Sequence, residues 1–232
     1  MAGSEQLAPS AIAATCAARY VRPMQTMDPP CDTPDGARSS PAAARNALAI
    51  LEVLKAVLPP RGEVLEIASG TGQHAAAFAA ALPGLIWHPT DVSDEALDSI
   101  AAWRCTGPPN LAAPARLDVT DPAAWPVSPV DAVVAINLVH ISPWRTTMAL
   151  LQGAACSLPR GGLMLLYGPF READRPLAES NAAFDASLKA RDPEWGLRSV
   201  EAVAAEAAGQ GLALTLRKSM PANNLSLLFR RI

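Results

Sequence analysis

Apolar and polar positions alternate in blocks from Ser40 onward, and the blocks predict helices and strands in turn. Ser40 is a suitable N-cap, Pro41 fits the first helical position, and apolar residues at helical spacing continue until Pro59, so a helix is expected here. Five apolar runs predict strands over residues 62–68, 85–91, 113–119, 130–139 and 163–170, with helices over 71–84, 93–103 and 146–162 between them. The segments VLEIA, AVVAI and LMLLY are almost continuously apolar, which is typical of strands buried on both faces of a sheet.

The order of these elements predicts an α/β fold of the Rossmann-like type. Strands that alternate with helices favour a mostly parallel sheet with helices on both faces. The chain then ends differently, with a helix over 199–212 followed by strands over 212–218 and 223–232 without a helix between them. We therefore expect seven strands, the last two forming an antiparallel pair at the sheet edge. Residues 171–196 form an insertion.

The domain organisation follows from composition. Residues 1–38 are rich in Pro, Asp, Gly and Ser toward their end and predict a disordered leader, whereas 39–232 predict one domain. The first part of the leader is poor in acids and has some character of a transit peptide. Met24 and Met27 offer other starting points, so it stays open whether residues 1–26 belong to the natural protein.

Charge and cysteine usage exclude several function classes. A net charge of −3 and a pI near 5.6 give no general attraction to nucleic acid or to a membrane surface. The four cysteines form no C-x-x-C pair and the three histidines no H-E-x-x-H motif, so neither a disulfide framework nor a bound metal is expected. No apolar run reaches the length of a membrane span. A reducing cytoplasm is the simplest location, and the oligomeric state stays open.

A glycine-containing turn follows the first strand in the segment VLEIASGTGQHAAAF, residues 64–78. Gly70 and Gly72 allow a sharp turn and close approach of a ligand. Asp91 ends the next strand, where a carboxylate can accept both hydroxyl protons of a ribose. Asp118 can meet the exocyclic amine of an adenine, with the Val119 amide nearby. An N-cap of a helix that begins at 120 or 121 is the alternative for Asp118.

Glu66 is a carboxylate inside a strand that should be buried, so it needs a cationic or hydrogen-bonding partner. It would repel the pyrophosphate of a dinucleotide, whereas S-adenosylmethionine brings an ammonium and a sulfonium group. The spacing Gly70-x-Gly72-x-x-Ala75 also satisfies the loose dinucleotide fingerprint. An NAD-type oxidoreductase therefore stays an alternative.

The pattern Glu66-x-Ala68-x-Gly70-x-Gly72, with Asp91 and Asp118 on the following strands, resembles the class I S-adenosylmethionine-dependent methyltransferases over residues 62–168. Ala68 departs from that pattern, which usually has glycine. A closer resemblance, from residue 40 to the C-terminus, is to the uncharacterised methyltransferase-like 26 branch. It rests on the segments SPAAARN, LEIASGTGQHAAAFA, HISPW, YGPF, SNAAFDASL, RDPEWG and MPANNLSLLFRR.

The resemblance implies a methyltransferase with S-adenosyl-L-methionine as cofactor. It implies that Glu66 or its loop meets the methionyl ammonium, that Asp91 binds the ribose and that Asn137 lies near the sulfonium. The full set of cofactor-binding residues that we expect is Glu66, Ala68, Ser69, Gly70, Thr71, Gly72, Asp91, Val92, Asp118, Val119 and Asn137. A subunit that binds the cofactor but transfers nothing is a further alternative.

The acceptor side rests on polar residues that should surround the pocket mouth. His140 and Tyr167 are the predicted catalytic residues, because an imidazole titrates near neutral pH and the tyrosine lies near the end of the fifth strand. The predicted substrate-binding residues are Arg45, Asn46, Asn181 and Asn223. The alternatives are a loop hydrogen bond for His140, a solvated helix face for Arg45 and Asn46, and a turn for Asn223.

The sequence after the fourth strand reads NLVH and lacks the D/N-P-P-aromatic motif of many methyltransferases that act on nucleic acids. Together with the acidic pI, this favours a small-molecule or protein methyl acceptor over a nucleic acid.

Overall fold

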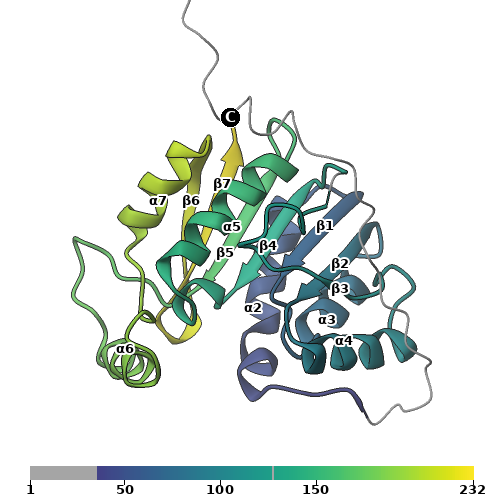
Figure 1. The fold of residues 1–232 in the computed structure, drawn as a ribbon, viewed down its shortest axis with the longest axis horizontal. Coiled ribbons are helices and arrows are strands. Elements are labelled where there is room, and N and C mark those ends of the chain that lie inside the picture. Colours follow the sequence, from purple (N-terminus) through teal and green to yellow (C-terminus); the bar gives the residue numbers. More distant parts are fainter. Residues whose placement is uncertain (1–35, 127) are drawn as a thin grey trace, which may run out of the picture.

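The computed structural model describes residues 36–126 and 128–232 and is built around one seven-stranded sheet (Figure 1). Its strands lie in the order β3-β2-β1-β4-β5-β7-β6. They are β1 (Gly62–Ile67), β2 (Leu85–Asp91), β3 (Ala115–Arg116), β4 (Ala132–Ile136), β5 (Leu163–Gly168), β6 (Leu212–Met220) and β7 (Asn224–Arg231). The predicted leader, residues 1–38, lies almost wholly outside the described residues, so its boundary stays a prediction.

The pairing of the strands confirms the predicted sheet. β1 runs parallel to β2 and β4, β2 to β3, and β4 to β5. β7 is antiparallel to both β5 and β6, and it lies between them. The C-terminal pair is thus the antiparallel finish that two consecutive strands without an intervening helix indicate.

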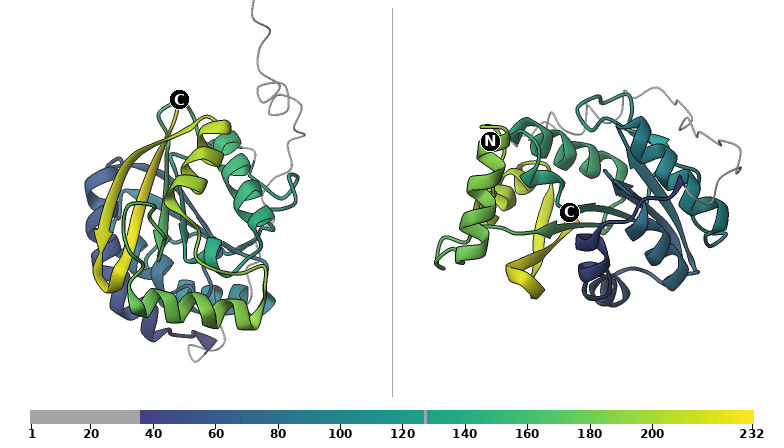
Figure 2. Two further views of the ribbon diagram at one scale, coloured as in Figure 1. Left: turned by 90° about the vertical axis from the view of Figure 1, so that its left-hand side faces the viewer. Right: turned by 90° about the horizontal axis from the view of Figure 1, so that it is seen from below.

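Helices cover both faces of the sheet. On one face, α2 (Pro41–Val57) and α3 (Gln73–Ala81) pack against Trp87 and the even-numbered apolar residues of β1 and β4. On the other, α5 (Trp144–Ser157) and α7 (Val200–Gly209) pack against Leu65, Ile67 and Phe229. Viewed from the ends of the parallel strands, α2 and α5 lie on opposite sides of the sheet (Figure 2). α4 (Asp94–Thr106) packs beside α3 and β2.

Local chemistry explains where the first helix begins. The Ser40 hydroxyl accepts a hydrogen bond from the Ala43 N–H, and Pro41 occupies the first turn, as the sequence predicts. α2 ends at Val57, ahead of the two prolines at 59 and 60. The N-terminal turns of α2 lie beside the carboxyl ends of β4 and β5.

Two elements differ from the sequence prediction. The third strand is only Ala115–Arg116, because it pairs with β2 alone and is preceded by Pro114, which has no N–H to donate. The insertion, residues 171–196, contains the helix α6 (Glu179–Arg191), which stands clear of the two helical layers near the end of β5 (Figure 1). α6 therefore adds a wall to that edge of the sheet.

Cysteine pairing also differs from the prediction. Cys105 and Cys156 are both disulfide-bonded, and no described cysteine is a free thiol. These two residues therefore do not support the expectation of a reducing cytoplasm, which rested on unpaired cysteines. The location of the protein stays a prediction. Within 36–126 and 128–232, no helix is both long and apolar enough to cross a membrane.

Candidate functional site

Most of the predicted site residues lie at the carboxyl ends of four neighbouring strands, β2, β1, β4 and β5. The connections from β1 and β4 run to opposite sides along the sheet, and ligands of α/β proteins bind at such a reversal. The loop 68–72 follows β1, Asp91 ends β2, and Asn137 follows β4. The topology thus brings residues from three distant segments to one edge.

The loop after β1 passes through left-handed backbone at Ala68, Gly70 and Gly72, whose φ angles are 54°, 58° and 78°. A methyl group added at Gly70 would meet no atom within 4 Å, whereas one at Gly72 would lie 2.9 Å from the Ile100 Cα in α4. Gly70 therefore leaves open space for a ligand. Helix packing accounts for Gly72, so its role at the cofactor stays a prediction.

The other residues of this loop are held by their neighbours. Ser69 donates its N–H to the Thr90 carbonyl over 2.8 Å, and its hydroxyl accepts the Thr90 N–H over 3.2 Å. The Thr71 carbonyl accepts a hydrogen bond from the Ser99 hydroxyl over 2.8 Å. Ala68 adopts this left-handed conformation at a cost of about 1 kcal/mol. A glycine, which is usual at this position in the class I pattern, would adopt it freely. The loop is thus fixed before any ligand binds.

Asp91 ties the loop after β1 to the end of β2. Its Oδ2 accepts the Gly70 N–H over 2.9 Å, and its Oδ1 accepts the N–H groups of Val92 and Ser93 over 2.8 and 3.0 Å. These bonds hold the carboxylate beside the open space at Gly70. Val92 is half exposed next to it and offers an apolar surface. This arrangement fits a ribose or another diol-bearing group.

Glu66 has a hydrogen-bonding partner within the protein. Its carboxyl is buried, and Oε2 accepts the indole N–H of Trp87 over 2.7 Å. Burial raises the pKa of Glu66 to about 7, although the Trp87 hydrogen bond opposes that shift. The indole accounts for the buried carboxyl without a ligand. Glu66 alone therefore does not indicate a cationic cofactor, and its contact with an ammonium group stays a prediction.

Asp118 is exposed, and its Oδ1 accepts both the N–H and the hydroxyl of Thr120, over 2.8 and 2.7 Å. This bonding is of the capping type, but residues 119–125 form turns, so the expected helix does not begin there. Val119 is buried in the core. A contact of these two residues with an adenine stays a prediction.

A second polar group lies where α2 meets the end of β5. Asn46 Oδ1 lies 2.7 Å from Nε2 of His74, which stacks on Phe78. Burial lowers the pKa of His74 to about 4, so the ring is neutral near pH 7 and donates this bond. The Tyr167 hydroxyl has no hydrogen-bond partner among the described residues. Burial raises the pKa of this phenol, and the Asn46 amide beside it opposes the shift.

His140 lies in the protein interior. Its side chain is fully buried, packs edge-on against Phe170 at 4.7 Å, and has no hydrogen-bond partner on either ring nitrogen within the described ranges. Burial lowers the pKa of His140 to about 3, so the imidazole is a very weak base. The loop hydrogen bond weighed as the alternative is not formed either. This environment does not favour the predicted catalytic role.

A cavity of about 790 Å³ opens between α2, α6 and the turn that joins β6 to β7. Five predicted residues line it, namely Arg45, Asn46, Asn137, Tyr167 and, from α6, Asn181. Asn224 also lines it. The remaining lining residues were not predicted: Ala42, Pro169, Ser180, Phe184, Pro221 and Ala222. The structure therefore gathers most of the predicted acceptor side around one space of small-molecule size.

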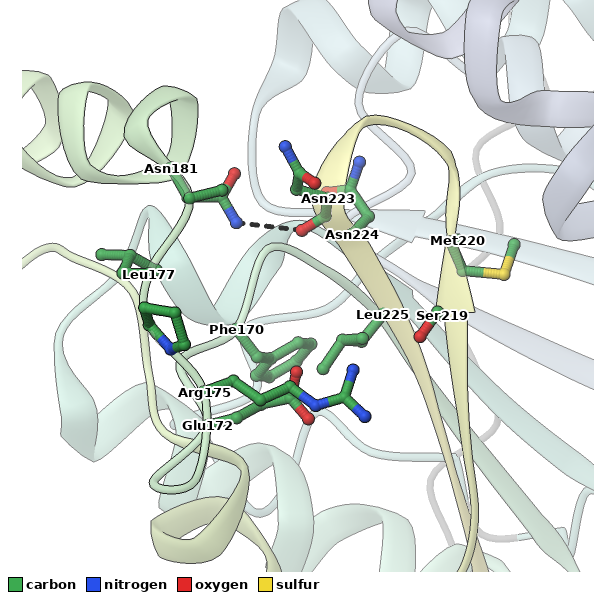
Figure 3. A pocket seen from close by; sticks show the side chains of 12 residues that line it. Phe170, Glu172, Arg175, Leu177, Asn181, Ser219, Met220, Asn223, Asn224 and Leu225 are labelled. Carbon is green, nitrogen blue, oxygen red and sulfur yellow. Dashed lines mark hydrogen bonds between the residues drawn. The ribbon is translucent and has the colours of Figure 1, made fainter.

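A smaller cavity of about 210 Å³ lies between the segment that follows β5 and the β6–β7 turn (Figure 3). Asn181 Nδ2 donates to the Asn223 carbonyl over 2.9 Å, and the Asn223 amide donates to the Ser180 hydroxyl over 3.0 Å. Asn223 lines only this smaller cavity, and it also has the left-handed φ of a turn residue, 58°. Asn181 and Asn224 line both cavities, so the two spaces adjoin.

Sequence reasoning missed two kinds of residue here. Trp87 and His74 lie in apolar or alanine-rich segments, and only strand register and helix packing bring them to Glu66 and Asn46. Phe184 belongs to the insertion, for which no helix was predicted. The alternation of charged and apolar residues around Phe184 in SNAAFDASLKAR was an available signal of helical character.

A family model described as "Protein of unknown function (DUF938)" matches residues 37–231. Solved structures share the fold. An O-methyltransferase family protein from Burkholderia thailandensis is 20% identical, with a TM-score of 0.66 over 82% of this chain and 57% of that one. Human N-acetylserotonin methyltransferase, solved in complex with SAM, is 16% identical, with a TM-score of 0.68 over 82% of this chain and 52% of that one.

An O-methyltransferase family 2 protein from Planctomyces limnophilus, solved in complex with apigenin, is 22% identical, with a TM-score of 0.67 over 82% of this chain and 60% of that one. The chain thus spans 52% to 60% of the length of these three structures. At these identities the likeness shows the Rossmann-like methyltransferase fold.

We expect Glu66→Gln to remove a pH dependence of stability. Between pH 4.5 and about 7 the unfolded chain ionises Glu66 while the folded chain keeps it protonated, so the free energy of unfolding falls as pH rises through this interval. Glutamine keeps an acceptor for Trp87 but cannot ionise. Above pH 7 the variant should be more stable than wild type by up to about 3 kcal/mol in urea unfolding.

The control is Glu52→Gln, whose carboxylate is exposed on α2. Stability profiles of wild type and Glu66→Gln that stay parallel from pH 4 to 8 would contradict the assigned burial of Glu66.

We expect the two glycines of the loop to differ on substitution. Gly72→Ala should lower the free energy of unfolding by about 2 kcal/mol or more, because the methyl group meets the backbone of α4. Gly70→Ala should lower it by about 1 kcal/mol, the strain of a left-handed alanine. Equal losses in urea unfolding would show that the space at Gly70 is not open.

Proposed function

The chain belongs to the DUF938 family, and we propose that it is an S-adenosylmethionine-dependent methyltransferase of the methyltransferase-like 26 branch. One observation carries the proposal. The Asp91 carboxylate accepts the Gly70 N–H beside open space, and it does so where the connections from neighbouring strands run in opposite directions along the sheet. The N-acetylserotonin methyltransferase that shares the fold was solved with SAM. That likeness supports the cofactor assignment.

The residues present fit the cofactor. Asp91 would accept the ribose hydroxyl protons, and the half-exposed Val92 would pack against the adenosine. Asp118 has a second carboxylate oxygen for the adenine amine, with the Val119 backbone beside it. The space at Gly70 would admit the chain that links the sulfur to the amino acid. Ala68, Ser69, Thr71, Gly72 and Asn137 would complete this wall.

S-adenosylmethionine supplies a methyl group already activated by a positive sulfur, so the protein's tasks are to position the acceptor and exclude water. Tyr167 suits the first task. A tyrosine phenol is protonated at neutral pH and burial raises its pKa further, so Tyr167 donates a hydrogen bond to an acceptor group rather than removing a proton. His140 is too deeply buried and too weak a base to take that proton in this conformation. We therefore propose catalysis by positioning.

The sheet disfavours the oxidoreductase alternative. The usual dinucleotide-binding sheet has the strand order 3-2-1-4-5-6, built from two parallel βαβαβ halves. Here an antiparallel strand, β7, lies between β5 and β6. A subunit that binds the cofactor without transferring the methyl group stays the second alternative. It predicts binding of the cofactor without product over a broad panel of acceptors.

Calorimetry with S-adenosylhomocysteine and with NADH tests the proposal. The protein should bind the former and not the latter. Gly70→Ala should weaken the binding of S-adenosylhomocysteine at least about tenfold, because its methyl group occupies the space beside Asp91. Gly209→Ala at the end of α7, where an added methyl also meets nothing within 4 Å, is the matched control and should bind as wild type does.

Tight binding of NADH with no response to S-adenosylhomocysteine would overturn the proposal. Unchanged affinity in Gly70→Ala would place the ligand elsewhere.

A further inference from the structure

The charge around the 790 Å³ cavity has one sign. Arg45 is its only charged lining residue, and no carboxylate reaches it from the part of the chain that the structure describes. Arg45 is exposed on α2 and makes no ion pair or hydrogen bond with another described residue. No acidic residue stands in the first turn of that helix. The cavity thus presents an unneutralised cation at its mouth.

The polar groups beside Arg45 are hydrogen-bond donors. Asn46 lines the cavity and uses its Oδ1 for His74, so its amide N–H groups remain as donors, and they lie close enough to the Tyr167 hydroxyl to oppose the rise that burial causes in the pKa of that phenol. The Tyr167 hydroxyl is buried at the cavity wall, and the Asn46 amide lies beside it, but no described group meets it in full hydrogen-bond geometry. A buried polar group normally has such a partner, so this hydroxyl is available to donate to a ligand in the cavity. Guanidinium, amide and phenol together suit an acceptor-rich group.

The rest of the lining is apolar or small. Phe184, Pro169 and Pro221 contribute much of it, and Phe184 is partly exposed toward the space. A space of this volume is typical of sites for small organic molecules. The bound molecule should therefore combine an apolar body with a group that only accepts hydrogen bonds.

We propose that the methyl acceptor is a small organic molecule with an apolar body and a carboxylate, and that Arg45 binds this carboxylate. The inference rests on the proposed function and names its substrate class. Carboxylate chemistry could also come from the methionyl part of the cofactor. The cavity wall favours the acceptor, because Gly70 and Asp91 do not line the cavity, whereas Phe184 and Pro221 do.

The test uses matched ligands on the protein saturated with S-adenosylhomocysteine. One set is 4-hydroxybenzoate, 4-hydroxybenzamide and 4-hydroxybenzylamine; a second is indole-3-acetate, indole-3-acetamide and tryptamine. The acid of each set should bind at least about tenfold more tightly than its amide or amine in calorimetry. Arg45→Gln should reduce this preference to within about twofold, and Arg45→Lys should keep part of it.

Arg160→Gln is the matched control, because Arg160 is exposed at the opposite edge of the sheet, before β5. Its preference for acids should equal that of wild type. Amides or amines that bind as tightly as acids, a preference that survives in Arg45→Gln, or no binding by any of the six compounds would overturn the inference.

Binding of the cofactor product separates this inference from the proposed function. If S-adenosylhomocysteine does not bind wild type, the proposed function fails before any acceptor is added. If Arg45→Gln weakens S-adenosylhomocysteine at least about tenfold but leaves 5′-methylthioadenosine unchanged, Arg45 holds the carboxylate of the cofactor. That outcome overturns the assignment to the acceptor and leaves the proposed function standing.

Discussion

The site depends on the hydrogen bonds that backbone N–H groups donate to the Asp91 carboxylate. Gly70 donates from the loop after β1, while Val92 and Ser93 donate from the end of β2. Hydrogen bonds to a charged carboxylate are stronger than neutral ones, so they hold two loops in one arrangement. Because that arrangement lies where the sheet changes direction, a fixed carboxylate and open space occur side by side without any ligand.

The sequence predicts the sheet well because β1, β4 and β5 are almost continuously apolar and every helix except α6 begins or ends at Ser, Pro or Gly. It predicts less at the short β3, since two residues at a sheet edge leave little apolar pattern. It misses α6, whose face toward the cavity carries both Phe184 and Asn181 and therefore has no simple apolar stripe. These shortfalls concern the elements that depend most on tertiary contacts.

The ends of the strands predict where the site residues lie better than they predict what those residues do. Asp91 and Asn137 lie where their strands end, as expected. The sequence indicates that the buried Glu66 carboxyl needs a partner, but it does not identify that partner as Trp87 of the next strand. His140 shows the same limit, because burial that removes its basicity follows from packing against Phe170. Electrostatic roles are thus set by neighbours that are distant in the sequence.

The proposed cofactor site at Asp91 and the proposed acceptor cavity, lined by hydrogen-bond donors, both lie at the carboxyl ends of the parallel strands. We propose above all that the adenosine of S-adenosylmethionine lies against Asp91 and that its amino-acid chain passes Gly70. A crystal structure with S-adenosylhomocysteine tests this most directly. We predict ribose hydroxyls within hydrogen-bond distance of Asp91 and the homocysteine chain beside Gly70. A ligand bound away from both residues, or none at saturating concentration, would contradict the account.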